Sequence, residues 1–230
     1  MLNKGDFHIH SNASDGDLSP REIIIEAKQR GVDIISISDH NTTAGIKEAA
    51  EAGSQYGVSV VPAVEVSARY KNEKVHILGY FKNSKYNDGT FQEVLNLIKS
   101  RNAKNARSIL NLINPDASEK YLSVSEVIYL LRSYDAAVVL AHPVRIEGKY
   151  ITDILNFPFD GIEAKYCTNS FLDSFYFMAA AISRFSFYTA GSDFHTNLRK
   201  DIKHSPIGEP CLDGKEIDNF LRKSGVMLLC

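Results

Sequence analysis

The sequence of 230 residues predicts an α/β fold in a single domain. Short apolar runs rich in β-branched residues alternate with segments of helical periodicity along most of the chain, and polar motifs follow several of the runs. Strands that alternate with helices favour a mainly parallel sheet. About seven such units that close on themselves would form a barrel, with the active site at the carboxyl ends of its strands.

The first third of the chain contains three predicted strands and two predicted helices. Ser19-Pro20-Arg21-Glu22 has the Ser, Pro and Glu of a helix start with a capping box, and Gly31 ends that helix. The strands are predicted at residues 5–10, 33–38 and 58–66, and the helices at residues 20–30 and 42–56. A turn at Tyr70-Lys71-Asn72-Glu73 leads to a strand at 74–81, so this connection is predicted to be a hairpin.

A small helical insert is predicted at about residues 90–134. Apolar side chains recur there at helical spacing in two stretches, which Asn114-Pro115-Asp116 separates. The stretch is about twice as long as a simple crossover requires, so we expect an insert that can act as a lid. Strand and helix then alternate again, with strands at 136–141, 161–166, 187–192 and 226–229 and helices at 151–156, 170–184 and 214–223.

Composition limits the classes of partner. The formal net charge is -2 with acids and bases interspersed, which argues against an extended nucleic-acid surface or a membrane patch and leaves a small anionic substrate. Cys167, Cys211 and Cys230 are too few and too scattered for a disulfide framework, as is typical of a reducing compartment. The N-terminus has no apolar signal segment, and no run reaches the ~18 apolar residues of a membrane span. We therefore expect a soluble, cytoplasmic protein.

Six of the seven histidines lie in short motifs, most of which end a predicted strand and carry an acid. The motifs are Asp6-Phe7-His8-Ile9-His10, Ser38-Asp39-His40-Asn41, Val75-His76-Ile77-Leu78, Ala141-His142-Pro143 and Gly191-Ser192-Asp193-Phe194-His195. Imidazole and carboxylate are the usual ligands of Zn, Mn and Fe. One isolated histidine is most often a hydrogen-bonded, half-buried residue. Six in strand-end motifs predict a multi-metal enzyme, because burying so many titratable groups without metal leaves charges uncompensated.

The period-two geometry of strands explains how these motifs can converge. Side chains two apart share a face, so His8 and His10 can point into one site, as can Asp193 and His195. The faces that carry the ligands of the next two strands are otherwise lined by small residues, which leaves room for ions. Asp15, in the loop after the first strand, can reach the same site.

Three further short motifs lie among the histidine motifs along the chain. They are Ser14-Asp15-Gly16, Val64-Glu65-Val66-Ser67 and Gly161-Ile162-Glu163. This ordered set, from residue 6 to about residue 195, resembles the PHP (polymerase and histidinol phosphatase) superfamily, and most of all its small stand-alone phosphoesterases. The resemblance implies a distorted (βα)7 TIM-like barrel and two or three divalent ions of Mn, Fe or Zn. It implies one ion held by His8, His10, Glu65 and Asp193, a second held by Glu65, His76 and His142, and a third held by Asp15, His40 and His195.

The resemblance also implies an activity, that of a metal-dependent phosphoesterase, a hydrolase acting on phosphoester bonds. The implied substrate is a small phosphomonoester of nucleotide type, such as a nucleoside 3′,5′-bisphosphate or the end of a short oligoribonucleotide. Ions a few ångströms apart can hold a phosphate ester and acidify a bridging water to hydroxide, which would attack it.

Basic residues near the motifs are candidates for binding the substrate. Arg145, three residues after His142, is the catalytic and phosphate-binding candidate, because a guanidinium makes bidentate contacts with phosphate. Arg101 and Lys104, in a basic helix segment of the insert, are further substrate-binding candidates. Three other basic residues, Arg199, Lys200 and Lys203, are expected in a surface loop after the last motif.

Three acids beside the motifs are expected to have supporting roles. Asp6 and Asp39 are expected to orient the ligating histidines, as outer partners in metal sites usually do, or to cap a strand or helix. Glu163, at the end of a predicted strand, is expected to be structural.

Three alternative functions stay open at this stage. A histidinol-phosphate-type phosphatase would use the same ligand set. An amidohydrolase-type metalloenzyme also has His-x-His on its first strand, but it would not require Asp15, His40 and Asp-x-His together. A non-catalytic metal-binding module would be expected to lose ligands, and the set here is complete.

Overall fold

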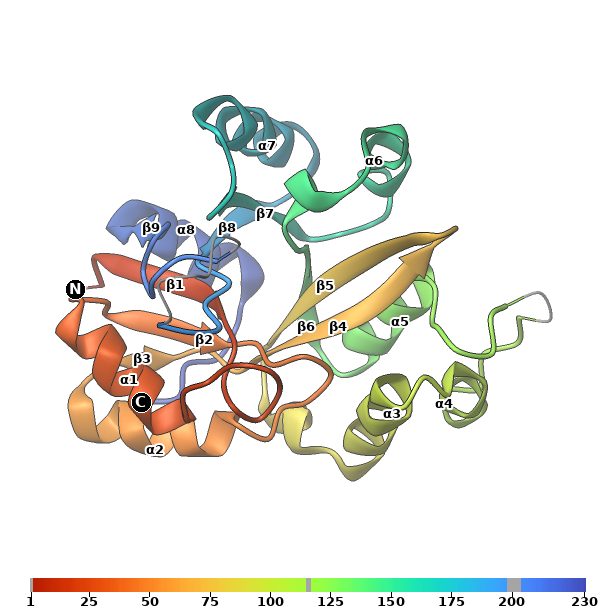
Figure 1. Ribbon diagram of the computed structural model, residues 1–230, viewed down its shortest axis with the longest axis horizontal. Coiled ribbons are helices and arrows are strands. Elements are labelled where there is room, and N and C mark those ends of the chain that lie inside the picture. Colours follow the sequence, from red (N-terminus) through yellow and green to blue (C-terminus); the bar gives the residue numbers. More distant parts are fainter. Residues whose placement is uncertain (1, 115–116, 198–203) are drawn as a thin grey trace.

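The computed structural model describes residues 2–114, 117–197 and 204–230, and it has a mixed α/β fold (Figure 1). Its strands are β1 (Lys4–Ile9), β2 (Ile34–Ile37), β3 (Ser59–Val60), β4 (Ala63–Tyr70), β5 (Glu73–Phe81), β6 (Ala136–Leu140), β7 (Gly161–Tyr166), β8 (Phe187–Gly191) and β9 (Leu212–Asp213). They form a four-stranded sheet of order β3-β2-β1-β9 and a five-stranded sheet of order β4-β5-β6-β7-β8. The expectations for Arg199, Lys200 and Lys203 lie outside the described residues.

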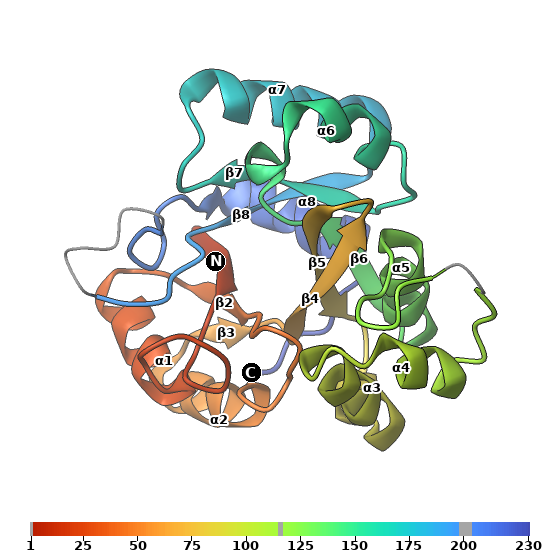
Figure 2. The same cartoon turned by 45° about the vertical axis from the view of Figure 1, so that its right-hand side comes forward.

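The helices lie outside the strands (Figure 2). They are α1 (Pro20–Gln29), α2 (Ile46–Tyr56), α3 (Gly89–Lys99), α4 (Ala103–Ile109), α5 (Val124–Ser133), α6 (Gly148–Ile154), α7 (Phe171–Arg184) and α8 (Gly214–Ser224), with 3-10 turns η1 (Ser84–Asn87) and η2 (Pro143–Arg145). The predicted capping box at the start of α1 is present, since the side chains of Ser19 and Glu22 each accept the other's backbone N–H. Among the described helices, none has the length and apolar character to cross a bilayer.

The four-stranded sheet carries the first two ligand-bearing strand ends. β1 pairs in parallel with β2, and β2 with β3, as the alternating pattern predicts. Apolar residues of α1 and α2, such as Ile23 and Ala49, pack with Ile35 and Ile37 of β2 in one buried cluster. The short strand β9, which pairs antiparallel with β1, was not predicted.

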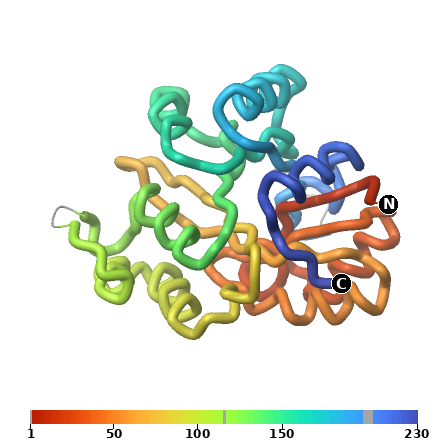
Figure 3. Tube along the Cα trace, turned by 180° about the vertical axis from the view of Figure 1, so that it is seen from behind, coloured from red at the N-terminus to blue at the C-terminus, as the bar shows by residue number. Residues whose placement is uncertain are grey.

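The five-stranded sheet is mixed, which corrects the expectation of a mainly parallel sheet. β4 and β5 form the predicted antiparallel hairpin, with Lys71 at φ 53° in its turn. β5 also pairs antiparallel with β6, whereas β6, β7 and β8 run parallel. α5, at the end of the predicted insert, packs on β4, β5 and β6, with Leu131 against Gly79. Figure 3 shows α3 and α4 beyond it at the edge of the molecule.

Two predicted strands differ from the structure. The run 58–66 was predicted as one strand, but it contains β3 in one sheet and β4 in the other, with Pro62 between them. Proline has no N–H for a strand ladder, so the chain changes sheets there. The predicted strand at 226–229 is an extended segment that makes one isolated bridge, between Leu229 and Val60.

The two sheets approach each other at two seams, both beside the ligand motifs. At one seam, Asn41 N–H donates to the carbonyl of Glu65 over 2.8 Å. At the other, His10 N–H donates to Phe194 and Asp193 N–H donates to His8, each over 2.9 Å. The described strands pair as two sheets, and closure into one barrel stays a prediction. The seams bring the carboxyl ends of β1, β2 and β8 to the start of β4.

Candidate metal centre

Glu65, near the start of β4, lies at the centre of the predicted ligand set and is fully buried. Its Oε1 lies 2.8 Å from Nδ1 of His76 on β5 and 3.0 Å from Nε2 of His142, which follows β6. Its Oε2 lies 2.7 Å from Nδ1 of His40, which follows β2. One carboxylate therefore joins donors from three different strands or the loops that follow them.

The seam between β1 and β8 supplies the next donors. Nε2 of His8 lies 3.3 Å from Oδ1 of Asp193, and Nε2 of His10 lies 3.0 Å from the same oxygen. Each of these nitrogens is also 3.4 Å from Glu65. The period-two argument is confirmed on β1, because both rings point to one side of the strand.

Asp15 closes the group from the loop after β1, and it is half exposed. Its Oδ1 lies 3.5 Å from Nε2 of His195, and its Oδ2 lies 3.8 Å from Nε2 of His40. The structure thus brings all nine predicted ligand residues into one continuous cluster.

The donor atoms have the arrangement expected around cations. Nε2 of His8 faces Nε2 of His10 at 3.1 Å, and Nδ1 of His76 faces Nε2 of His142 at 3.2 Å. Two further buried atoms, His10 Nδ1 and His76 Nε2, have no hydrogen-bond partner among the described residues, whereas His40 Nδ1 and Glu65 Oε2 face each other at 2.7 Å. Leaving such atoms unsatisfied costs about 1–3 kcal/mol each. Imidazole nitrogen with carboxylate oxygen suits Mn, Fe and Zn, so the residues present fit divalent transition ions.

The electrostatics of the cluster favour bound positive charge. Burial disfavours protonation of His8, but the carboxylates of Glu163, Asp193 and Glu65 outweigh it and raise the pKa of His8 well above its usual value. Burial likewise opposes ionisation of Glu65, and the surrounding histidines nevertheless lower its pKa well below the usual range. By contrast, burial dominates at His76 and lowers its pKa to about 3. The field of the acids thus attracts cations, while His76 stays neutral as a ligand must.

Backbone strain is concentrated at the same strand ends. Asn41, His142 and Asp193 adopt φ values of 51°, 26° and 52°, in the left-handed region that non-glycine residues rarely occupy. Such conformations cost about 1–3 kcal/mol each and persist where the surroundings fix them, most often at functional sites. Gly191 permits the close packing of β8 on β1, because a Cβ there would lie 2.2 Å from Cβ of His8.

Glu163 on β7 is the supporting residue that the sequence argument underestimated. It is fully buried, its Oε1 lies 3.0 Å from Nδ1 of His8, and its Oε2 accepts the backbone N–H of His142 over 2.7 Å. A proton on Nδ1 of His8 would leave its Nε2 lone pair facing the cluster. The signal was Glu163 itself, an acid inside a buried strand.

Asp6 and Asp39 accept hydrogen bonds from backbone N–H and hydroxyl groups. They were expected to orient histidine rings, and this contact differs from that expectation. Asp6 accepts from Ser192 Oγ over 2.6 Å and from the backbone N–H of Ser192 and His8. Asp39 accepts from the N–H and hydroxyl of Ser11 over 2.7 Å and 2.6 Å. These bonds join the ligand loops, and burial raises the pKa of Asp6 to about 6.

Arg145 lies at the mouth of the cluster, as expected. A cavity of about 620 Å³ is lined by Arg145 together with Asp15, His76 and Asp193. Nη1 of Arg145 donates to Tyr166 Oη over 2.9 Å and to Asp193 over 3.2 Å. Tyr166, whose role the sequence did not reveal, also donates to Asp193 over 2.7 Å.

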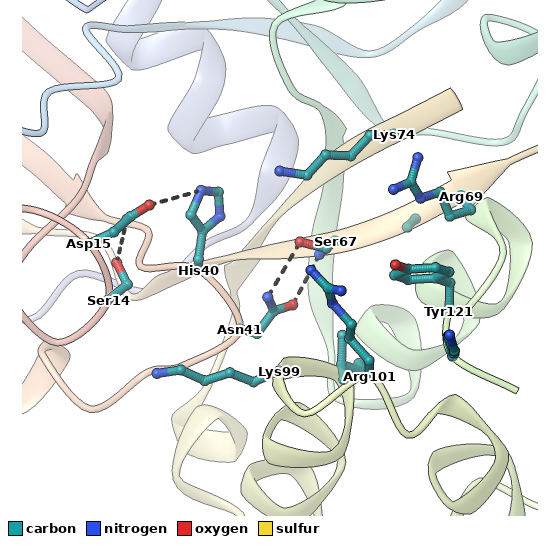
Figure 4. Close-up of a pocket in the computed structure, with 13 residues that line it drawn as sticks. Ser14, Asp15, His40, Asn41, Ser67, Arg69, Lys74, Lys99, Arg101 and Tyr121 are labelled. Atoms are coloured by element: carbon teal, nitrogen blue, oxygen red, sulfur yellow. Dashed lines mark hydrogen bonds and ion pairs between the residues drawn. The ribbon is translucent and has the colours of Figure 1, made fainter. Parts of the chain in front are cut away.

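A second cavity, of about 420 Å³, adjoins the cluster at Asp15 and His40 (Figure 4). Five basic residues line it: Arg69, Lys74, Lys99, Arg101 and Lys120. They come from the β4–β5 hairpin and from the segments around α3 and α4, and Arg69 stacks over the ring of Tyr121 at 4.8 Å.

Of the two insert residues predicted to bind substrate, Arg101 lines this pocket. Lys104 does not, since it pairs with Glu119 over 3.1 Å and lines a different surface cavity.

Comparison with known proteins places the chain in a family. A family model described as the PHP domain matches residues 6–154. The chain is 42% identical over 79 residues to a 5'-3' exoribonuclease of Haemophilus influenzae, a match that covers 34% of this chain and 29% of that protein. It is 40% identical over 74 residues to a 3',5'-nucleoside bisphosphate phosphatase of Chromobacterium violaceum, covering 32% and 26%. The chain thus matches less than a third of the length of these relatives.

A solved structure extends the likeness of fold to nearly the whole chain. That protein, from Bifidobacterium adolescentis, is described as a metal-dependent phosphoesterase and is 19% identical. The superposition covers 96% of each chain with a TM-score of 0.74. Motif order, site geometry and the family match agree, and the chain belongs to the PHP domain family.

Proposed function

We propose that this protein is a metal-dependent phosphoesterase that hydrolyses a small, nucleotide-type phosphomonoester. The observation that carries the proposal is a cluster of nine nitrogen and oxygen ligand residues, most of them buried, directly beside a pocket lined by five basic residues. Metal ligands alone would suit several hydrolases, but the adjacent basic pocket selects an anionic substrate. Membership of the PHP domain family supports the reaction class.

The proposed ions fall into three groups of donors. His8, His10, Glu65 and Asp193 would hold one ion, Glu65, His76 and His142 a second, and Asp15, His40 and His195 a third. Distances within the groups run from 2.8 Å to 3.8 Å, and the contact of 2.7 Å between Glu65 and His40 joins the second group to the third. Manganese, iron and zinc all suit these donors. We further infer that the two sheets act together as a distorted barrel with the ligands at one rim.

Bound divalent ions supply Lewis acidity, which polarises a phosphoester and makes water acidic enough to attack it near neutral pH. The protein's own residues then bind and orient. The guanidinium of Arg145 would bind a phosphoryl oxygen, since it reaches the mouth of the cavity while Nη1 anchors it to Tyr166 and Asp193. Glu163 would keep the Nδ1 proton on His8, and Tyr166 would hold Asp193 in place.

The charge of the second pocket favours a nucleotide over histidinol phosphate. A nucleoside 3′,5′-bisphosphate or an oligoribonucleotide end carries a further phosphate beyond the one that is hydrolysed, and Arg69, Arg101 and Lys120 could bind it. Histidinol phosphate carries an ammonium group in the corresponding part of the molecule, which these cations would repel. Both curated relatives are named for nucleotide phosphoesters, which supports the same choice. Lys99 and Arg101 would make the insert a substrate-binding lid.

The test is a substrate and metal screen on the full chain. Protein stripped with a chelator and reloaded with Mn should contain two or three ions per chain and hydrolyse p-nitrophenyl phosphate. Among nucleotides, bisphosphates, 5′-phosphorylated dinucleotides and histidinol phosphate, we expect the highest kcat/KM for substrates with two phosphates. Metal-loaded protein that is inert toward the whole panel would overturn the proposal and favour a binding module.

A further inference from the structure

Helix α7 presents an apolar face to solvent. Of the eight large hydrophobic side chains that are exposed in the described chain, five lie on this helix: Phe171, Leu172, Phe175, Tyr176 and Ile182. Its inner face contributes Phe177 and Ala181 to the core. In Figures 1 and 3, α7 lies at the outer edge of the molecule with no described element beyond it.

The exposed residues form one stripe along the helix. They recur at steps of three, four and seven residues, which places them on one side of an α-helix. Ala179, also exposed, lies on the same side between Phe175 and Ile182. The stripe is therefore a continuous surface with a small residue near its centre.

The exposed area of the stripe is a large part of what an interface buries. Phe171 is 84% exposed, Phe175 65% and Tyr176 56%. With roughly 200 Å² for each aromatic side chain, these three alone leave about 400 Å² of mainly apolar surface in water. Leu172 and Ile182 add to it. Exposed patches of this size mark interaction sites, and a standard interface buries about 800 Å² on each partner.

The pattern of α7 fits a second copy of the same helix that runs antiparallel. Around a two-fold axis near Ala179, Phe175 of one copy lies level with Ile182 of the partner subunit, and the small Ala179 lets the helices approach. The stripe is thus self-complementary over the segment from Phe175 to Ile182.

The charges on α7 argue against a membrane as its partner. A helix that lies on a bilayer surface carries a polar face rich in Lys and Arg. In the described structure, the charged residues of α7 are one acid, Asp173, and one base, Arg184. The helix has no cationic face to meet anionic lipids.

We propose that the protein forms a two-fold symmetric dimer through the apolar stripe of α7. The stripe residues are absent from the candidate metal centre, so the dimer does not depend on the proposed catalytic function. Burying the stripe removes five of the eight exposed large hydrophobic side chains of the described chain from water, and this gain drives association.

Sedimentation velocity over a dilution series of the full chain tests the proposal. We expect a species of twice the 25.6 kDa chain mass that dissociates on dilution. Phe175→Asp places a charge in the stripe and should give monomer at every concentration. Tyr129→Asp is the matched control, since Tyr129 is 50% exposed on α5, and it should leave the dimer intact. Circular dichroism and metal content should be unchanged in both variants, because both positions are exposed.

A covalent readout supports the same test. Ala179→Cys should form an intermolecular disulfide on mild oxidation far faster than the native cysteines do, because the two-fold axis brings the two positions together. The proposal would be overturned if the wild-type protein were monomeric at every concentration, whether or not it bound lipid vesicles. A dimer that survives Phe175→Asp would overturn it equally.

Discussion

The candidate metal centre and the basic pocket beside it are built in opposite ways. Donors of the centre such as Glu65 and His8 are fully buried, come from strand ends, and each contacts several others. The cations of the pocket are mostly exposed and come from a hairpin, from the ends of helices and from the loop before α5. The centre therefore fixes chemical groups rigidly, whereas the pocket presents charge that can adapt to a ligand.

The two regions also differ in energetic cost. Buried donors without hydrogen-bond partners, such as His76 Nε2, destabilise the metal-free fold. Exposed lysines and arginines remain solvated and carry no such penalty. Substitutions in the centre should therefore abolish metal binding and turnover, and substitutions in the pocket should change only substrate affinity.

The largest effect is expected from Glu65→Gln. The amide keeps the shape of the side chain but removes the charge that five histidines surround. Since loss of an outer partner alone costs about 10–100-fold, we expect a loss of more than about 100-fold in kcat together with lost metal. Metal analysis and p-nitrophenyl phosphate turnover measure this. Glu119→Gln, at an exposed ion pair, is the control, and equal activity of the two variants would contradict the central role of Glu65.

Glu163→Gln should have the next largest effect. The carboxylate faces both Nδ1 of His8 and N–H of His142, and an amide can accept with only one of its two atoms. We expect a loss of about 10–100-fold in metal affinity or kcat. Isothermal titration with Mn and steady-state kinetics separate the two. Glu216→Gln is the control. It loses a contact with Lys165, which lies on the same strand as Glu163, and it should leave metal affinity and kcat unchanged.

Arg101→Ala should raise KM by about tenfold, or about 1.4 kcal/mol, for a substrate with two phosphates. The KM of p-nitrophenyl phosphate should not change, because that compound has no second phosphate to place in the pocket. The loss should shrink at high salt, since the contact is exposed. Lys104→Ala is the matched control within the same insert. If the two variants changed the KM of both substrates equally, Arg101 would not bind the second phosphate in the pocket.

The smallest effect is a shift in thermal stability with pH. Carboxylates raise the pKa of His8, His40 and His195 against the effect of burial, so these rings favour protonation in the metal-free fold. Their contribution to metal-free stability is complete below about pH 6.5 and is lost as pH rises through the raised values. Metal binding requires neutral rings, so its stabilisation should grow with pH.

We compare the melting temperature with Mn and with a chelator from about pH 6 to about pH 9. The difference between the two should grow by a few degrees as pH rises. Parallel curves would mean that these histidines do not take up and release protons in competition with metal.

Much of the candidate centre followed from local sequence rules. The His8 and His10 pair needed only the period of a strand, and the Ser19 and Glu22 cap needed only the sequence around one helix start. Other features depended on distant packing. Glu163 has neighbours from two other strands, so its contacts with His8 and His142 could not be deduced from its own segment. Lys104 failed as a pocket residue because a pairing with Glu119 turns it elsewhere.

By itself, the sequence determined which donors exist, on which strand ends they lie and which side of each strand they share. These properties depend on backbone geometry within a few residues. The tertiary structure decided that Glu65 joins His142, 77 residues away, to His40 and His76, and that Pro62 divides one apolar run between two sheets. Such contacts arise because the helices pack both sheets into one core, and packing of distant segments is not encoded in any single motif.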